Sequence, residues 1–327
     1  MTDHAPLRFA IQQIAQGRSL DREAATAAFD VLIRGDGGPI QAAALLMGLR
    51  TKGESAEEIA GAALALRCAM IPLDAENAEQ LVDTCGTGGG QVCTLNISTA
   101  AAFVVAGAGV PVAKHGNRSY TSRSGSADVL EALGVDITLA PDRARKVLRS
   151  VGLVFLFAPS YHPAMRHLGA VRKELGVTTI MNLLGPLVNP AGVVRQVIGV
   201  ADRSRAPLLA AALGVLGARH ALVLHADIGM DEISPSGKTS VWEVSDGKTS
   251  TWELDPSRFG LDCDDLDGLD GAEPAQNASR IEAMLGGKGS PAVRCAVLLN
   301  AAAALYVSGR GWSFEEAIER SRKALDS

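Results

Sequence analysis

The first 70 residues carry apolar side chains every three or four positions, the spacing of one buried helix face. The pattern predicts four consecutive helices. Pro39 suits the first turn of the third helix, and Ser55 with Glu58 reads as a capping box at the start of the fourth, which Pro72 ends. No catalytic group is visible here, so we interpret the region as a helical bundle or a dimer face.

The pattern changes after Gln80, where short apolar runs alternate with helical segments. This alternation is typical of an α/β domain with a largely parallel sheet flanked by helices. A hairpin follows around Asp246-Gly247, a dipeptide that favours a two-residue turn. The predicted strands are Leu81–Thr84, Val110–Ala113, Val154–Phe157, Val197–Val200, Ala221–Leu224, Thr239–Ser245 and Lys248–Leu254. The predicted helices of this part are Thr99–Ala106, Ala127–Leu133, Arg143–Val151, Pro207–Leu216, Ala275–Leu285, Ala292–Val307 and Ser313–Leu325.

The stretch from Leu81 to Gly134 contains one arrangement twice: a strand, a loop rich in Gly, and a helix start rich in Ser, Thr or Asn. Free backbone N–H groups at a helix start attract anions, and glycine lets the backbone approach phosphate oxygens. Glycines that only make tight turns are the simpler alternative, but two adjacent arrangements favour phosphate binding. The stretch matches neither a Walker loop, since no GKS or GKT follows, nor a GxGxxG dinucleotide fingerprint.

Positive side chains lie between these two arrangements, in the segment Lys114–Arg118 with sequence KHGNR. We expect the strand Val110–Ala113 to deliver this segment to a loop, after which another helix opens at Ser126. Lys114 and Arg118 would add full charges, and a guanidinium can bind a phosphate through two hydrogen bonds. Residue chemistry alone therefore predicts a polyphosphate or phosphosugar ligand.

Two adjacent carboxylates, Asp231 and Glu232, follow the strand Ala221–Leu224 in a loop. Adjacent carboxylates are usually solvated or cap a helix. Beside a phosphate site they gain a second interpretation, because Mg²⁺ bound to phosphates is typically held by one or two protein carboxylates. The acidic stretch Asp255–Gly271 lacks calcium-loop spacing, and we interpret it as a solvated linker.

Residues 160–192 interrupt the strand–helix alternation with two helical pieces that end in GPLVNP. We expect these pieces to pack back on the N-terminal helices. The predicted division is therefore a discontinuous helical domain, residues 1–72 with about 163–190, and an α/β domain, residues 73–162 with 191–327.

Composition and charge narrow the class of protein. Of 327 residues, 47% are hydrophobic and 20% charged, and the formal net charge of -5 argues against a general affinity for nucleic acid or anionic membranes. The five cysteines form no CxxC pair, which argues against a zinc site and a disulfide framework. The N-terminus lacks an apolar signal core, and no apolar run is long enough to span a bilayer. We expect a cytoplasmic protein with no membrane and no nucleic-acid partner.

Taken together, the motifs resemble those of the anthranilate phosphoribosyltransferase family of the tryptophan pathway. The resemblance covers nearly the whole chain in order, from the N-terminal helices to NAAAALYVSG (Asn300–Gly309). The other matching motifs are DTCGTGG (Asp83–Gly89), NIST (Asn96–Thr99), KHGNR (Lys114–Arg118), SGSADVLEALG (Ser124–Gly134), HPAM (His162–Met165), VRKELG (Val171–Gly176), NLLGPLVNP (Asn182–Pro190) and MDEIS (Met230–Ser234).

The resemblance implies a helical domain plus an α/β domain, related to the pyrimidine nucleoside phosphorylases, and a homodimer formed through the helical domain. It implies transfer of the 5-phosphoribosyl group from 5-phosphoribosyl-1-pyrophosphate to the amine of anthranilate. The products would be N-(5-phosphoribosyl)anthranilate and pyrophosphate, with Mg²⁺ as the cofactor. An aromatic amine is already neutral at pH 7, so no catalytic residue is assigned beyond the substrate and metal ligands.

The same resemblance assigns three sets of site residues. The set for phosphoribosyl pyrophosphate is Gly86, Thr87, Gly88, Gly89, Thr94, Asn96, Ser98, Thr99, Lys114 and Ser126. The set for anthranilate is Gly86, His115, Asn117, His162, Arg172, Gly185 and Pro186, with Arg172 as the partner of the acceptor's carboxylate. The metal set is Ser98, Asp231 and Glu232.

The chain departs from the family pattern at three positions. The family loop GTGGDG reads GTGGGQ here, so Gly90 and Gln91 replace Asp and Gly, and Thr178 stands where Arg is common. The missing carboxylate predicts an altered Mg²⁺ dependence.

These departures leave open a paralogue that uses another aromatic amine or a nitrogen heterocycle, although Arg172 argues for a carboxylate-bearing acceptor. A pyrimidine nucleoside phosphorylase fits KHGNR and GTGG less well. A non-catalytic relative that binds nucleic acid or a protein partner should have lost Asp231 and Glu232 and gained a basic face, whereas this chain is acidic.

Overall fold

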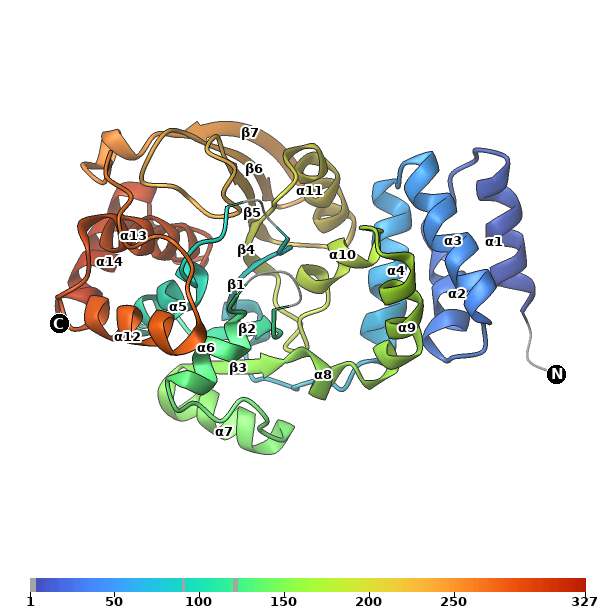
Figure 1. Cartoon of the computed structure of the whole chain (residues 1–327), viewed down its shortest axis with the longest axis horizontal. Helices are drawn as coiled ribbons and strands as arrows, with labels where there is room; N and C mark the ends of the chain where they lie inside the picture. Colours follow the sequence, from blue (N-terminus) through green and yellow to red (C-terminus); the bar gives the residue numbers. More distant parts are fainter. Residues whose placement is uncertain (1–3, 90–91, 120–122) are drawn as a thin grey trace.

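The computed structural model of the protein describes residues 4–89, 92–119 and 123–327. Two of the three departures from the family pattern, Gly90 and Gln91, therefore lie outside the described residues. Figure 1 shows a bundle of helices at one end, a twisted sheet in the middle and a second group of helices at the C-terminal end.

The N-terminal bundle has local sequence signals at its helix starts. Asp21 accepts a hydrogen bond from Ala24 N (2.8 Å), and Ser55 with Glu58 forms the predicted capping box. The four predicted helices are confirmed, and their apolar faces form one buried cluster. They are α1 (Ala5–Ala15), α2 (Arg22–Ile33), α3 (Pro39–Lys52) and α4 (Ala56–Ala69).

The central sheet has seven strands in the order β3-β2-β1-β4-β5-β6-β7. Strands β1 to β5 are parallel, and β6 and β7 extend the sheet as an antiparallel hairpin, so the predicted fold class is confirmed. The hairpin has the predicted bounds. The strands are β1 (Val82–Gly86), β2 (Val112–Gly116), β3 (Leu153–Phe157), β4 (Arg195–Gly199), β5 (His220–Ala226), β6 (Thr239–Ser245) and β7 (Lys248–Leu254).

One prediction about the sheet is wrong: Lys114, His115 and Gly116 belong to strand β2 and not to a loop. Their backbones continue the parallel register with β3, where Lys114 lies opposite Phe155 and His115 opposite Leu156. The polar side chains suggested a loop. Strand β1 supplies hydrogen-bond acceptors for Lys114 Nζ and for His115 N, so these polar residues can belong to a buried strand.

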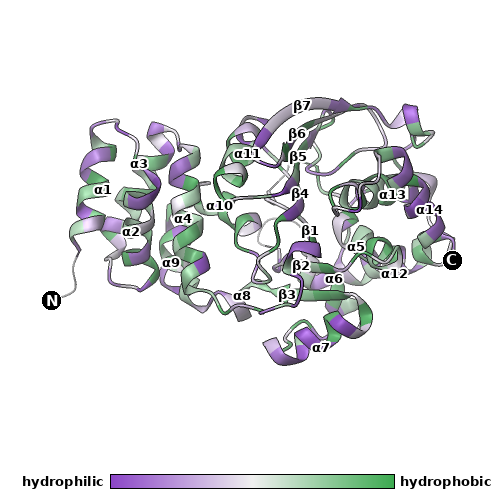
Figure 2. Ribbon diagram, turned by 180° about the vertical axis from the view of Figure 1, so that it is seen from behind, coloured by the Kyte–Doolittle hydropathy of each residue, from purple (hydrophilic) through white to green (hydrophobic). Residues whose placement is uncertain are grey.

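Helices cover both faces of the sheet (Figures 1 and 2). On strand β5, Leu222 and Leu224 pack against α5 and α13, whereas Ala221 and Val223 face α11 and the bundle, as the two-residue period of a strand requires. All seven predicted helices of this part are present, with bounds that shift by two residues or fewer. They are α5 (Ile97–Gly107), α6 (Ser126–Ala132), α7 (Pro141–Val151), α11 (Ala206–Val215), α12 (Pro274–Leu285), α13 (Pro291–Tyr306) and α14 (Phe314–Leu325).

The segment between β3 and β4 leaves the sheet and returns to it. Its main helix, α9 (Arg166–Leu175), packs on α2 and α3, and the short α10 (Met181–Leu184) contacts α4. A short turn, α8 (Ala158–Tyr161), connects the segment to β3. These contacts confirm that the helical pieces pack back on the N-terminal helices.

One buried cluster runs from the bundle onto the sheet. It joins α1–α4 to α11 and to Ile198 and Val223 on β4 and β5. Bundle and α/β part therefore share a core, and the proposed domain boundaries stay a prediction. Within the part of the chain that the structure describes, no helix is long and apolar enough to cross a membrane.

The acidic stretch 255–271 is more than a solvated linker. Its end pairs with the segment that follows the glycine-rich turn: Leu95 N donates to Leu269 O (2.7 Å), Gly271 N donates to Cys93 O (2.9 Å), and Thr94 forms a bridge with Asp270. Backbone hydrogen bonds fix this end, and charge composition could not reveal them. The stretch thus holds the segment 93–95 in place.

Candidate functional site

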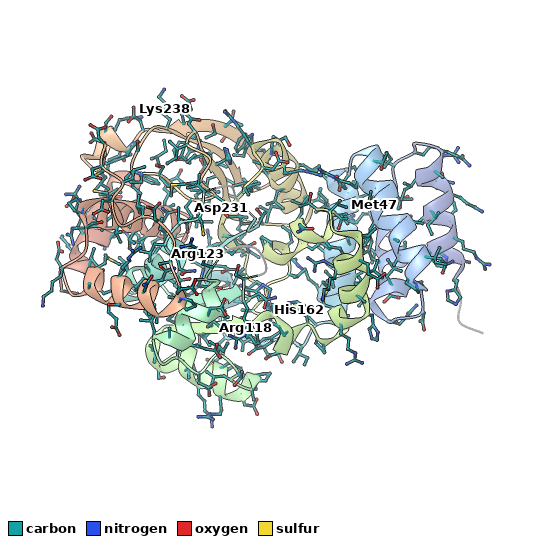
Figure 3. All side chains as sticks on the ribbon, in the orientation of Figure 1. Met47, Arg118, Arg123, His162, Asp231 and Lys238 are labelled. Atoms are coloured by element: carbon teal, nitrogen blue, oxygen red, sulfur yellow. The ribbon has the colours of Figure 1, made fainter. Side chains whose placement is uncertain are left out.

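The polar residues singled out by the sequence gather at the carboxyl ends of the parallel strands. Strand β1 lies between β2 and β4, and the chain moves outward from β1 in both directions, so a topological switch point lies between β1 and β4. Open α/β sheets bind ligands in the crevice at such a point. Figure 3 labels Asp231 near the middle of the α/β part and His162 on the side that faces the bundle.

The turn after β1 has the backbone geometry that the glycines predict. Gly88 and Gly89 have φ of 66° and 80°, backbone angles that residues other than glycine rarely adopt. Thr87 fixes the base of the turn, because its N–H donates to Gly199 O (2.9 Å) and its hydroxyl accepts from Ala201 N (3.2 Å). The turn is therefore tied to the end of β4.

Close backbone approach at this edge depends on Gly199, which sequence reasoning missed. A Cβ at Gly199 would overlap the backbone oxygen of Asp231, and a Cβ at Gly86 would stand 3.1 Å from Asp231 Oδ2. The loop that carries the two carboxylates thus lies directly on the ends of β1 and β4. A glycine at the last position but one of a predicted strand was the available signal.

The start of α5 holds a carboxylate of the protein itself. Ser98 N donates to Glu232 Oε1 (2.9 Å), and Thr94 Oγ1 donates to Glu232 Oε2 (3.0 Å). Glu232 thereby occupies the anion-binding end of the helix, as the dipole favours. Thr99 is buried, and its hydroxyl has no hydrogen-bond partner among the described residues.

Burial sets the charge of the carboxylate pair. It raises the pKa of Glu232 to about 8, with help from the neighbouring charge of Asp231, and burial also raises the pKa of Asp231. A cavity of about 10 Å³, room for about one water molecule, lies beside both side chains. Two buried carboxylates with raised pKa values fit a divalent cation, which would relieve their repulsion. The described residues contain no group of three or more His, Cys, Asp or Glu side chains that could hold a metal.

Lys114 lies beneath this pair, buried in the sheet. Its ammonium donates to Thr84 O and to Ser98 Oγ (3.3 Å). Burial lowers the pKa of Lys114, and the charges of Asp83 and Glu232 oppose that shift. The Lys114 ammonium therefore lies in the field of two carboxyl groups, those of Asp83 and Glu232.

Asp83 is a second residue that sequence reasoning gave no role. It is fully buried, accepts from His115 N (3.2 Å) and from Asn189 Nδ2 (2.8 Å), and burial raises its pKa. It fixes the backbone of β2 where Lys114 and His115 lie. The second residue of a strand carries no local signal of such a role.

Ion pairs connect Arg118, which follows β2, to helix α6. Arg118 binds Asp128 (3.0 Å) and Glu131 of α6, so its guanidinium is committed to carboxylates and not held free for phosphate. Ser126 Oγ donates to Asn117 O (3.4 Å) at the start of α6. A Cβ at Gly116 would overlap Ser126 Oγ, so the end of β2 and this helix start lie together.

His115 and His162 form a buried pair of neutral imidazoles. Their ring centroids are 5.1 Å apart. Burial, reinforced by His162, lowers the pKa of His115 to about 3, and burial lowers the pKa of His162 to about 4. The His115 ring hydrogen-bonds to the Gly185 backbone and the His162 ring to the Val188 backbone, while neither Nε2 has a hydrogen-bond partner among the described residues.

The remaining residues predicted for an acceptor lie on the returning segment. Pro186 accepts a hydrogen bond from Gln196 Nε2 (2.8 Å) through its backbone oxygen, which anchors the turn to β4. Arg172 is half-buried on α9. Thr178 is exposed in the turn between α9 and α10. The structure thus gathers the residues predicted to bind phosphate at the sheet edge, and it places Gly185 beside the histidine pair. Arg172 lies on α9, the helix that packs on the bundle.

Comparisons with known proteins agree with this architecture. A glycosyl transferase family helical bundle domain matches residues 8–70, and a glycosyl transferase family α/β domain matches residues 78–327. The anthranilate phosphoribosyltransferase of Bradyrhizobium sp. (strain ORS 278) is 48% identical over 98% of this chain and 94% of its own. The crystal structure of the Thermus thermophilus anthranilate phosphoribosyltransferase has a TM-score of 0.91 at 42% identity, covering 97% of this chain and 94% of that one. The Saccharomyces cerevisiae enzyme, solved in complex with phosphoribosyl pyrophosphate (PRPP) and Mg, has a TM-score of 0.88 at 28% identity, covering 99% and 94%.

Proposed function

This chain belongs to the anthranilate phosphoribosyltransferase family, and from that premise we propose that it transfers the 5-phosphoribosyl group of PRPP to the amine of anthranilate, with release of pyrophosphate. The single observation that carries the proposal is the site at the β1/β4 switch point, where a glycine turn, a helix start, a buried lysine and two carboxylates meet within a chain 48% identical to a named family member.

The donor half of the site is the edge formed by β1, β2 and the starts of α5 and α6. We assign PRPP to the turn Gly86–Gly89, whose glycines let a phosphate approach the backbone, and to Thr94, Asn96, Ser98 and Thr99 at the start of α5. Lys114 and Ser126 complete the set. A helix start favours a phosphate dianion, and Ser98 N becomes available to it once Glu232 releases that N–H. The unpartnered hydroxyl of Thr99 supports this assignment, because a buried hydroxyl normally has a partner.

Asp231 and Glu232 are the groups that would hold Mg²⁺, with Ser98 as the third ligand. Their burial together is unfavourable without a cation, as their raised pKa values express. The ion would supply charge neutralisation on the pyrophosphate of the donor. Glu232 must then exchange its bonds to Ser98 N and Thr94 Oγ1 for the cation, which leaves those donors for phosphate oxygens.

Departure of pyrophosphate is the demanding step of this reaction. The ribosyl carbon gains positive character while negative charge grows on the leaving group. The Lys114 ammonium is fixed in place before the reaction, so it stabilises that charge without reorganisation.

The acceptor half is the histidine pair with the returning segment. We assign anthranilate to Gly86, His115, Asn117, His162, Arg172, Gly185 and Pro186. Both histidines are neutral at pH 7, so each Nε2 offers a lone pair to an N–H of the amine and cannot donate a proton to it. We pair the acceptor's carboxylate with Arg172.

Anthranilate fluorescence tests the proposal directly. The signal should fall only when PRPP, Mg²⁺ and protein are all present, and Arg172→Ala should raise the anthranilate KM at least tenfold while the donor KM stays within twofold. A protein that binds PRPP by calorimetry but consumes no anthranilate would keep the donor site and overturn the acceptor. A panel of aromatic amines and nitrogen heterocycles would then identify the acceptor.

A homodimer is the second part of the proposal. Two large apolar side chains, Phe9 on α1 and Ile40 on α3, are 50% and 84% exposed, and these helices pack on each other at the outer end of the bundle. We infer that these two side chains belong to one interface, because large exposed apolar patches mark protein–protein contacts. Sedimentation equilibrium should give twice the chain mass of 33.9 kDa, and the double variant Phe9→Lys/Ile40→Lys should give the single mass.

A further inference from the structure

The start of α5 is tied to a distant helix by a side chain that takes no part in the site described above. Asn277, on α12, is fully buried. Its Nδ2 donates to Asn96 Oδ1 (3.0 Å), although the two residues are 181 positions apart. Its Oδ1 accepts from Ala272 N (3.0 Å), just after the acidic stretch. Asn277 therefore touches both the donor half and the segment that holds residues 93–95.

The Asn96 amide is bound on both of its ends. Its Oδ1 accepts from Asn277 Nδ2 and from Ser124 Oγ (3.1 Å), which uses both lone pairs of the oxygen. Its Nδ2 donates to Ser124 O (3.1 Å), which uses one of two hydrogens. Although Asn96 stands at the start of α5, its side chain makes no capping bond there. The amide instead links α5 to the loop that precedes α6.

Two backbone groups determine which way both amides point. Ala272 N can only donate, so it must face Asn277 Oδ1, and Asn277 must turn its N–H groups toward Asn96. Ser124 O can only accept, so it must face Asn96 Nδ2. The orientation of an asparagine amide is ambiguous by itself and is decided by its network. Here the network is anchored at each end and permits one arrangement.

We propose that Asn277 is a positioning residue for the donor substrate: it fixes the Asn96 amide so that an N–H, and not the carbonyl oxygen, is presented to PRPP. The inference rests on the proposed function, because it needs an anionic phosphosugar at Asn96. A donor N–H attracts that ligand, whereas a flipped amide would present an oxygen and repel it.

Asn277→Asp tests the orientation with little change of shape. The introduced carboxylate, when ionised, still accepts from Ala272 N, but it presents a second oxygen to Asn96 Oδ1. The Asn96 amide then either moves away from this oxygen or flips against Ser124 O, and in both cases its N–H is no longer held toward the ligand. We expect a donor KM and a donor Kd about tenfold higher at pH 8, with the anthranilate KM within twofold of the parent protein.

The pH dependence of this variant separates positioning from general support. The introduced carboxyl, when protonated, regains a donor O–H and can again bind Asn96 Oδ1, and burial raises its pKa. The ratio of donor KM between variant and parent should therefore fall from about ten at pH 8 to about two at pH 6. Charged groups present in both proteins cancel in this ratio; they include Glu232 at the start of α5, Asp128 on α6 and Asp270 at the bridge.

Two further variants cover the case in which Asn277→Asp does not fold. Asn277→Ala removes both hydrogen bonds and should raise the donor Kd threefold to fivefold at pH 8 and pH 6 alike. Ser321→Ala removes a buried hydrogen bond on α14 (Ser321 Oγ to Ala317 O, 2.9 Å) and should lower the melting temperature without changing the donor Kd.

Calorimetry of PRPP with Mg²⁺ distinguishes the two possible failures. If the parent protein does not bind PRPP, the proposed function fails. If the parent binds and Asn277→Asp binds equally well at pH 8, the positioning role is overturned. A donor Kd ratio that stays constant from pH 8 to pH 6 in Asn277→Asp would likewise overturn it, since a loss of packing alone has no reason to titrate.

Discussion

The buried histidine pair predicts how the protein loses stability in acid. His162 is 6% exposed, hydrogen-bonds to the Val188 backbone, and has a pKa lowered from 6.5 to about 4. Protonation of an unfolded histidine near pH 6.5 therefore favours unfolding, because the folded protein does not bind that proton until the pH approaches 4. The stabilising contribution is present above pH 6.5 and is lost as the pH falls toward 4.

The perturbation is His162→Asn, which keeps an N–H donor for Val188 and removes the titrating ring. Each pH unit below 6.5 costs about 1.36 kcal/mol per shifted group. Between pH 7.5 and pH 5, His162 alone should cost the parent protein about 2 kcal/mol that the variant keeps. His115, with a pKa near 3, should contribute a loss of similar size over the same interval, so the variant should still show about half of the combined effect.

Urea unfolding at pH 7.5, 6.5 and 5 measures this difference, and His167→Asn on the exposed face of α9 is the matched control. The free energy of unfolding should fall more steeply with acid in the parent and in the control than in His162→Asn. Equal slopes in the parent and in His162→Asn would refute the claim that this ring is buried in its neutral form.

Two further perturbations test the placement of the carboxylate loop and of the bundle. Gly199→Ala puts a methyl group into the space of the Asp231 backbone oxygen, so kcat/KM should fall at least a hundredfold. Gly214→Ala on α11 is the control: its Cβ would meet open space, and kcat/KM should stay within twofold. A normal kcat/KM in Gly199→Ala would show that the carboxylate loop can lie elsewhere. Arg205→Met leaves the buried Glu54 carboxyl, whose pKa burial already raises, without its ion-pair partner. Urea unfolding should therefore show that the free energy of unfolding falls by about 3 kcal/mol. Adding Glu54→Gln to the same chain should recover part of this loss. The exposed pair Arg149 and Glu76 is the comparison, and its removal should change stability by less than about 1 kcal/mol; equal losses for the two pairs would contradict the role of burial.

Local signals account for the parts of the fold that were predicted well. Ser55 and Glu58, and Ser313 and Glu316, form the capping boxes that their spacing predicts. Asp246-Gly247 forms the hairpin turn, with φ of 45° and 78°. In each case the interacting residues are close in sequence, so the pattern of residue types contains the interaction. The strand β2 was predicted too short because its last residues are polar.

In the candidate site, too, the features with a local sequence signal were predicted and the long-range contacts were not. Gly88 and Gly89, Asp231 and Glu232, and the Ser and Thr residues of α5 were recognisable because glycine turns, helix starts and paired carboxylates have local chemistry. The partners that complete the site were not. Glu232 meets Ser98 across 134 positions, and Asn189 meets Asp83 across 106. Nothing in the residues beside Asn277 or Gly199 indicates which distant atoms they contact.

The sequence by itself determined the order of helices and strands, the two glycine-bearing turns and the residue types that can bind a phosphosugar, because these depend on short-range periodicity and backbone conformation. Only the tertiary structure decided which of those groups are buried and therefore charged or neutral. Lys114, Asp83 and Glu232 acquire shifted pKa values because the sheet removes them from water, and His115 and His162 stay neutral for the same reason. The physical cause is desolvation, which depends on every element packed around a side chain and so cannot be read from its neighbours in sequence.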